Sequence, residues 1–132
     1  MIKCIVAGGV IVNPLEEILL VYMPRTQTWG FPKGHVIMNK DIYLAALREI
    51  KEETSIENLK LVTKLPVYER ETKQDSTRIK QCHFYLFTTT QLEVYSNDPF
   101  VSKVEWTKKD DVPTTLSYKE DVEFYNKIKH LL

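Results

Sequence analysis

Three glutamates stand close together in one short segment. Glu49, Glu52 and Glu53 lie in the run from Ala45 to Thr54. At roughly 100° per residue these side chains fall on one side of a helix, and the apolar residues of the run fall on another side that can pack against a sheet. Grouped carboxylates suit a divalent cation such as Mg²⁺, which prefers oxygen ligands and bridges them to phosphates. The helix alone leaves a second interpretation open, a solvated charged face.

The loop in front of this helix favours the metal interpretation. Residues 29–35 read Trp-Gly-Phe-Pro-Lys-Gly-His. The glycines allow backbone geometry that other residues resist, so Gly34 can offer its carbonyl at close range. Lys33 supplies a positive charge suited to a phosphate, while His35 can touch phosphate or hydrogen-bond the loop. A loop of this kind, leading into a helix with carboxylates, predicts a site for metal ions and a polyphosphate chain.

The elements that must position these residues are strands and helices in a mixed order. The pattern predicts two helices, at Asp41–Thr54 and Ser117–Leu132, the second with Ser117 and Glu120 at the spacing of a capping box. It predicts a loop over Pro24–Asn39 and strands over Lys3–Val12, Glu17–Met23, Leu59–Glu69, Lys80–Thr90 and Val101–Thr107, the first two forming a hairpin. The order lacks a strict βαβ rhythm, which favours an α/β fold with a mixed sheet between helices.

Length and composition limit the protein class. The chain has 132 residues, which we interpret as a single domain over 1–132. Its 18 basic and 18 acidic residues balance, which argues against binding nucleic acid by bulk electrostatics. No apolar run approaches the roughly 20 residues of a membrane span, and the N-terminus lacks a secretory signal. Cys4 and Cys82 are far apart and suit a reducing compartment. We expect a cytoplasmic monomer or homodimer.

Residues 34–56 resemble the Nudix box, whose pattern is G-x5-E-x7-R-E-U-x-E-E-x-G-U with U a bulky apolar residue. The matching positions are Gly34, Arg48, Glu49, Ile50, Glu52, Glu53 and Ile56. Two positions depart from the pattern. Lys40 stands at the first glutamate, with Asp41 beside it, and Ser55 stands at the late glycine. The glycine ends the helix in a left-handed conformation, so we expect Ser55 to carry a modest conformational cost.

The resemblance implies a Nudix-type α/β/α sandwich, with a mixed and mostly antiparallel-flanked sheet between helices. It implies hydrolysis of a nucleoside diphosphate linked to another group, with Mg²⁺ as cofactor and Mn²⁺ as the alternative metal. The metal ligands that it implies are Gly34, through its carbonyl, and Glu49, Glu52 and Glu53. Arg48 is implied to orient the glutamates, and Glu49 to act as ligand or general base. The base varies within the family, and candidates outside the box are Asp98 and Glu105.

The loop over residues 29–35 is similar to that of diadenosine polyphosphate hydrolases, and decapping and RNA pyrophosphohydrolase members carry a related loop. This resemblance implies a nucleotide as the small-molecule substrate. Tyr68 and Tyr85 follow the box and are candidates for stacking on a base. Arg70, Arg78 and Lys80 are candidates for a phosphate clamp, against the alternative of an ordinary polar hairpin loop. Lys33 and His35 complete the candidate substrate-binding set.

Two other functions stay open. Within the same class, the substrate is a (deoxy)nucleoside triphosphate or an RNA 5′ end; the balanced charge gives no support to an RNA path, so nucleic acid is expected only as a 5′-end substrate. From a different class, the chain is a weakly active or non-catalytic nucleotide-binding module. Lys40 and Ser55, where the box departs from its pattern, motivate this last hypothesis.

Overall fold

The structure, a computed structural model, describes residues 2–37, 40–71 and 77–132. The strands are β1 (Ile2–Val12), β2 (Glu17–Met23), β3 (Thr28–Gly30), β4 (Lys33–His35), β5 (Lys60–Lys64), β6 (Tyr68–Glu71), β7 (Arg78–Thr88) and β8 (Lys103–Lys108). The helices are α1 (Ile42–Thr54), α2 (Val112–Thr115) and α3 (Lys119–Ile128), with 3₁₀ turns at Lys109–Asp111 and Lys129–Leu131. No helix within the described ranges is both long and apolar enough to span a membrane.

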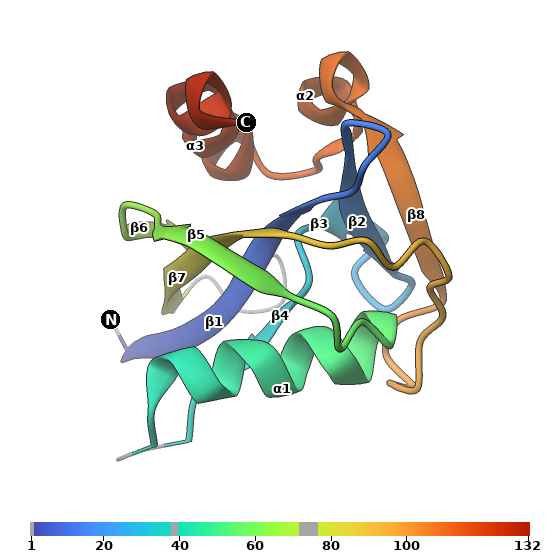
Figure 1. The fold of residues 1–132 in the computed structure, drawn as a ribbon. Coiled ribbons are helices and arrows are strands. Elements are labelled where there is room, and N and C mark those ends of the chain that lie inside the picture. The colour runs from blue at the N-terminus through green and yellow to red at the C-terminus, as the bar shows by residue number, and fades with distance from the viewer. Residues whose placement is uncertain (1, 38–39, 72–76) are drawn as a thin grey trace.

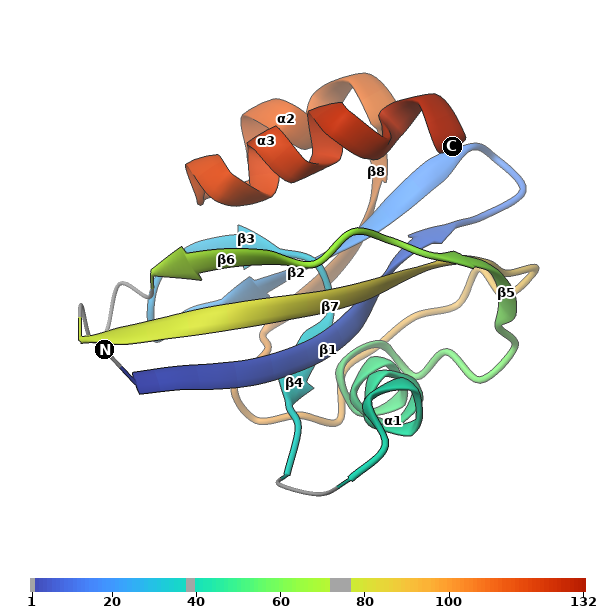
Figure 2. The same ribbon diagram turned by 90° about the vertical axis from the view of Figure 1, so that its left-hand side faces the viewer.

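A parallel pair of long strands forms the middle of the sheet. β1 and β7 pair along their whole length, from Ile2 opposite Arg78 to Val12 opposite Thr88. The other pairings are antiparallel: the order is β3-β2-β1-β7-β5, with β4 on β1, β6 on β7 and β8 on β2. Helix α1 covers one face of this sheet, and α2 and α3 cover the other (Figures 1 and 2). The predicted mixed sheet between helices is confirmed.

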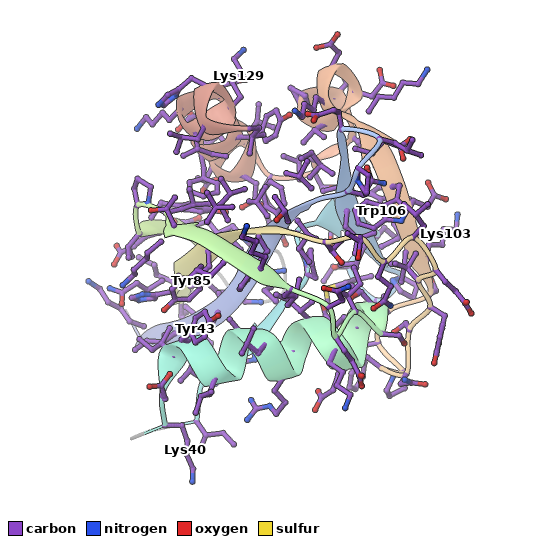
Figure 3. The ribbon with its side chains drawn as sticks, in the orientation of Figure 1. Lys40, Tyr43, Tyr85, Lys103, Trp106 and Lys129 are labelled. Carbon is purple, nitrogen blue, oxygen red and sulfur yellow. The ribbon has the colours of Figure 1, made fainter. Side chains whose placement is uncertain are left out.

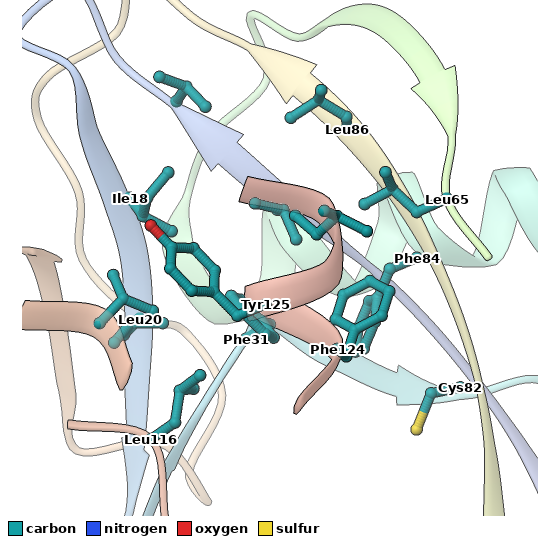
Figure 4. Close-up of a cluster of buried hydrophobic side chains, with 14 of the residues drawn as sticks. Ile18, Leu20, Phe31, Leu65, Cys82, Phe84, Leu86, Leu116, Phe124 and Tyr125 are labelled. Carbon is teal, nitrogen blue, oxygen red and sulfur yellow. The ribbon is translucent and has the colours of Figure 1, made fainter. Parts of the chain in front are cut away.

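Alternating side chains of the central strands build one core on each face. Ala46 and Ile50 of α1 are fully buried against a cluster that includes Ile11 and Phe87. On the other face, aromatic and aliphatic side chains pack beneath α3 (Figure 4). Phe31, from the loop between β3 and β4, lies in this second cluster with 1% of its surface exposed. The apolar core therefore fixes the position of the loop that precedes the glutamate helix.

Both ends of α1 are capped. At the start, the Asp41 side chain accepts a hydrogen bond from the Leu44 N–H at 2.9 Å. At the end, Ser55 adopts the left-handed conformation with φ 64°, and its N–H donates to the Lys51 carbonyl at 2.9 Å. The expected left-handed helix end is confirmed at a residue that has a Cβ. Asp41 supplies the N-cap and lies next to Lys40, which replaces the first glutamate of the box pattern.

Three local predictions need correction. The strand expected over Leu59–Glu69 is two strands, β5 and β6, because Pro66 lies between them and cannot donate to a ladder. The loop expected over Pro24–Asn39 contains the short strands β3 and β4. The capping box at Ser117 is wrong: α3 begins after Tyr118 without a side-chain cap, and the Ser117 hydroxyl instead accepts the Trp29 N–H at 2.8 Å.

Candidate active site

Glu53, in the last turn of α1, lies inside the protein and not on its surface. Only 4% of the residue is exposed. Its Oε1 accepts a hydrogen bond from the backbone N–H of Lys33 at 3.0 Å, which joins α1 to β4. Burial raises the pKa of Glu53 to about 8, although the Lys33 charge and this hydrogen bond act in the opposite direction. The fold therefore holds a carboxylate where its negative charge is costly in the absence of a cation.

Glu49 lies one turn earlier and packs against Gly34. A Cβ on Gly34 would lie 2.0 Å from the Glu49 carboxyl group, so a larger residue here would force the Glu49 side chain to move. All four glycines have negative φ, so the need at Gly34 is for space and not for an unusual backbone conformation. Arg48 Nη2 donates to Glu49 Oε1 at 3.2 Å. Burial raises the pKa of Glu49, and the Arg48 hydrogen bond opposes this shift.

A third carboxylate comes from a distant part of the chain. Asp98 lies in the irregular segment between β7 and β8, and its ligand oxygen and those of Glu49 and Glu53 lie within 4.8 Å of one another. Its Oδ1 also accepts the Phe100 N–H at 2.8 Å, which fixes the side chain locally. Two other candidates lie outside this group. Glu52 is half exposed, with its Oε1 4.0 Å from Arg48 Nε, and Glu105 is exposed on β8.

These three carboxylates, which we call the acidic triad (Glu49, Glu53 and Asp98), fit a divalent cation. They offer hard oxygen ligands from three positions around one point, which is the donor set that Mg²⁺ and Mn²⁺ prefer. Their mutual repulsion contributes to the raised pKa of Glu53, to which both Glu49 and Asp98 add. A bound cation would remove that repulsion and favour the ionised form of each carboxyl group.

A cavity of about 270 Å³ opens beside the acidic triad. Glu53 and Asp98 line one part of it. Cationic side chains from several elements also line it, namely those of Arg25, Lys33, Arg70 and Lys80. Aromatic side chains complete the wall, namely Trp29, Phe100 and Tyr118. The cavity thus offers oxygen ligands for a cation, positive charge for phosphates and flat apolar surface for a base.

Two of the cations that line this cavity, Lys33 and Arg70, are buried. Arg70 is 4% exposed, its Nε lies 3.5 Å from Asp121 Oδ1, and its guanidinium lies 4.0 Å from the centre of the Tyr118 ring. Burial, and then the charge of Arg70, lowers the pKa of Lys33. Burial lowers the pKa of Lys80 to about 8, with further contributions from Lys33 and Arg70. These positive charges repel one another, so an anion bound in the cavity would reduce that repulsion.

The remaining sequence candidates lie at different places. His35 lines the cavity with its side chain partly in solvent, and burial lowers its pKa. Tyr68 stacks on Phe124 at 4.4 Å and donates its hydroxyl hydrogen to Asp121. Tyr85 lies on the other face of the sheet, edge-on to Tyr43 at 5.0 Å and outside the cavity lining (Figure 3). Arg78 is exposed at the start of β7 and also lies outside the lining.

Asp121 is a site residue that the sequence reasoning missed. It is 3% exposed, lines the cavity from the first turn of α3, and accepts the hydrogen bond of Tyr68. A signal was present in the sequence. The buried residues of α3 are Asp121, Phe124, Tyr125 and Ile128. An acid thus occupies the first place of an i, i+3, i+4, i+7 apolar stripe, where a charge has to find a partner.

The chain and its fold are similar to those of known proteins. The NUDIX domain matches residues 3–128 of the chain. The structure of a Caenorhabditis elegans Ap4A hydrolase binary complex is similar with a TM-score of 0.82 and 26% identity, over 99% of this chain and 97% of that one. A MutT protein from Methanosarcina mazei has the same fold, with a TM-score of 0.78 and 18% identity over 98% and 95% of the two chains.

Relatives found by sequence are longer than this chain. A Mycobacterium tuberculosis protein designated MutT4 is 30% identical over 94 residues, which are 70% of this chain and 38% of that protein. The m7GpppN-mRNA hydrolase dcap-2 of Caenorhabditis elegans is 28% identical over 115 residues, 81% of this chain and 14% of that protein. The chain therefore spans less than half the length of these two relatives. With nearly its whole length matched by the family and the fold shared throughout, the chain belongs to the NUDIX domain family.

Proposed function

We propose that the protein is a Mg²⁺-dependent hydrolase of dinucleoside polyphosphates, with diadenosine polyphosphates as its favoured substrates. The observation that carries this proposal is the joint lining of one cavity by Glu53 and Asp98 of the acidic triad and by Lys33, Arg70 and Lys80. A polyphosphate chain placed there would be within reach of both a metal ion and these cations. Each partner would neutralise negative charge that the phosphates bring.

The residues take distinct roles in this proposal. Glu49, Glu53 and Asp98 hold the metal, and Glu52 is a further ligand on the exposed side of the site. When bound, the divalent cation supplies charge neutralisation at the phosphates and lowers the pKa of a coordinated water. Arg48 donates to Glu49 Oε1, which leaves Oε2 to serve either as a metal ligand or as the acceptor for the proton of the attacking water. Trp29, Phe100 and Tyr118 provide surfaces for the bases.

The choice of a dinucleotide substrate draws on two relatives of this chain. One is named an Ap4A hydrolase and the other an m7GpppN-mRNA hydrolase. In both named substrates a chain of phosphates joins two nucleosides. The first relative shares the fold over 99% of this chain with 26% identity, and this likeness favours the free dinucleotide. The balanced charge of 18 basic and 18 acidic residues also favours it over an RNA.

Purified protein given Mg²⁺ and a substrate panel tests the proposal. The panel holds diadenosine polyphosphates, capped RNA, 5′-triphosphorylated RNA, deoxynucleoside triphosphates and ADP-ribose, and chromatography resolves the products. We expect the highest kcat/KM with a diadenosine polyphosphate. Glu53→Gln, prepared in parallel, serves as the control for contaminating hydrolases and should lose activity by about 10²-fold or more because it removes a metal ligand. Nucleotide binding without turnover of any panel member would overturn the enzyme assignment in favour of a binding module.

A second candidate, removal of the cap from messenger RNA, is favoured by the similarity to dcap-2 over 81% of this chain. The same panel separates the two. Efficient cleavage of capped RNA together with slow cleavage of diadenosine polyphosphates would select decapping.

A further inference from the structure

The acidic triad depends on a segment that has no regular secondary structure. Asp98 follows β7 and precedes β8, within residues 89–102, while Glu49 and Glu53 belong to α1. Much of the segment faces solvent, and Tyr95 is 55% exposed. Apolar packing alone therefore does not fix where Asp98 lies. Hydrogen bonds must supply the rest of the positioning.

The end of α1 supplies these hydrogen bonds. The Asn97 N–H donates to the Glu52 carbonyl at 2.9 Å, and the Tyr95 N–H donates to the Thr54 carbonyl at 3.2 Å. The last carbonyls of a helix have no partner within the helix, so the segment satisfies groups that would otherwise need water. The two donors, Tyr95 and Asn97, closely precede Asp98 in sequence. The helix that carries Glu49 and Glu53 therefore also holds the backbone that carries Asp98.

Ser55 adds the side-chain part of this attachment. Its hydroxyl donates to the Tyr95 carbonyl at 2.7 Å, and Asn97 Nδ2 donates to the same hydroxyl oxygen at 3.4 Å. Its carbonyl accepts from Gln91 Nε2 at 2.8 Å. Tyr95 is thus bonded through both its N–H and its C=O to the end of α1. A separate bond, from Trp106 Nε1 to the Leu92 carbonyl at 2.9 Å, holds the earlier part of the segment against β8.

Ser55 makes these contacts from a backbone conformation that is unfavourable for a residue with a side chain. Its φ is 64°, in the left-handed region where glycine has no Cβ penalty. The Nudix box pattern has glycine at this position. Glycine would cap the helix equally well through its backbone, but it would have no hydroxyl for Tyr95 and Asn97. The hydroxyl is the feature that distinguishes this chain at the helix end.

We propose that Ser55 is a positioning residue: its hydroxyl fastens residues 95–97 to the end of α1 and thereby sets Asp98 against Glu49 and Glu53. This inference rests on the proposed function, because it takes the acidic triad as a metal site. Ser55 does not touch the metal or the substrate in this role. It acts through the backbone of Tyr95 and the side chain of Asn97.

Mn²⁺ binding and hydrogen exchange test the proposal without relying on turnover. Electron paramagnetic resonance of free Mn²⁺ gives the dissociation constant, and hydrogen exchange of the metal-free protein reports on residues 89–98. We expect Ser55→Gly to raise the Mn²⁺ dissociation constant roughly three- to tenfold, the size expected for one or two hydrogen bonds. It should also speed exchange in residues 89–98, while the melting temperature stays equal or rises because the left-handed strain is gone.

Three further variants make the result decisive. Ser55→Ala also removes the hydroxyl but keeps the strained Cβ, so it should weaken Mn²⁺ binding similarly while melting lower than Ser55→Gly. Ser102→Ala is the matched control, since this exposed serine forms no side-chain hydrogen bond in the described chain and should behave as the wild type. Asp98→Asn should weaken Mn²⁺ binding more than tenfold, and adding Ser55→Gly to it should weaken binding little further.

The outcomes separate the two proposals. Wild-type Mn²⁺ affinity or wild-type exchange in Ser55→Gly, together with weak binding in Asp98→Asn, would overturn the role of Ser55 and leave the metal site standing. Wild-type Mn²⁺ affinity in Asp98→Asn would show that Asp98 is not a ligand. The positioning role of Ser55 would then be overturned as well.

Discussion

The backbone N–H of Lys33 donates to Glu53 Oε1 at 3.0 Å, so a strand of the sheet holds a buried carboxyl group of the last turn of α1. Burial raises the pKa of that group from 4.5 to about 8. Between pH 4.5 and about 8, Glu53 is therefore protonated in the folded protein and ionised in the unfolded chain. This contribution to stability is complete below pH 4.5 and is lost as the pH rises through about 8.

We therefore predict that Glu53→Gln flattens the pH dependence of stability. Glutamine keeps an oxygen for the Lys33 N–H but never ionises, so the metal-free variant should lose less stability than the wild type between pH 5 and about 9. Thermal unfolding in EDTA across this range measures the effect. The same variant should gain no stability from added Mn²⁺, whereas the wild type should. Parallel stability curves for the two proteins would contradict the buried ionisation of Glu53.

Gly34→Ala should damage the metal site through a steric clash. A Cβ at Gly34 would lie 2.0 Å from the Glu49 carboxyl group, so Glu49 has to move away from Glu53 and Asp98. We expect Mn²⁺ binding to weaken at least tenfold, in line with the loss of one ligand. Gly30→Ala is the matched control, because its Cβ would meet nothing nearer than Lys33 Nζ at 3.7 Å. Equal Mn²⁺ affinity in both variants would show that Glu49 does not need the space beside Gly34.

Lys80 should give the proposed substrate binding a pH dependence. Its pKa of about 8 means that the side chain is charged below this pH and neutral above it. The KM for a diadenosine polyphosphate should therefore rise as the pH passes about 8, with kcat less affected. Lys80→Arg stays charged throughout and should flatten this rise. KM values of both proteins from pH 7 to about 9.5 provide the test, and an identical rise in Lys80→Arg would assign the titration to another group.

Asp121 should matter for stability as well as for the cavity. Its removal leaves Arg70 buried without its carboxylate, so Asp121→Ala should lower the free energy of unfolding by about 3–5 kcal/mol. Tyr68→Phe removes only one hydrogen bond to the same carboxylate and should cost about 1 kcal/mol. Urea unfolding measures both variants. Equal effects would mean that the ion pair with Arg70 adds nothing beyond the tyrosine bond.

The sequence predicted the glutamate helix because that helix depends on local signals, whereas the loop before it contains the short strands β3 and β4. The helix predicted over Asp41–Thr54 begins one residue before α1 and ends at the same residue. The expected left-handed conformation at Ser55 also followed from its place at a helix end. These features need only neighbouring residues and the 3.6-residue repeat.

The composition of the acidic triad could not be read in the same way. Helical spacing groups Glu49, Glu52 and Glu53 equally, yet only two of them join Asp98 because the sheet buries Glu53 and leaves Glu52 in solvent. The distance of Asp98 from the helix in sequence gave no local signal for their meeting. Ser117 shows the same limit. Its spacing to Glu120 predicted a helix cap, but its hydroxyl accepts a hydrogen bond from the distant Trp29 N–H instead. Tertiary contacts decide such positions.

The parallel pairing of β1 with β7 has a consequence for how the chain folds. Ile2 lies opposite Arg78 and Val12 opposite Thr88, so every bond of the central pair closes a loop of more than seventy residues. Closing such loops costs chain entropy before the contacts repay it, which slows folding relative to a fold of local hairpins. During synthesis one edge of β1 can pair early with β2 and β4, whereas the edge that receives β7 stays open until residue 88 has been made, after Glu49 and Glu53 but before Asp98.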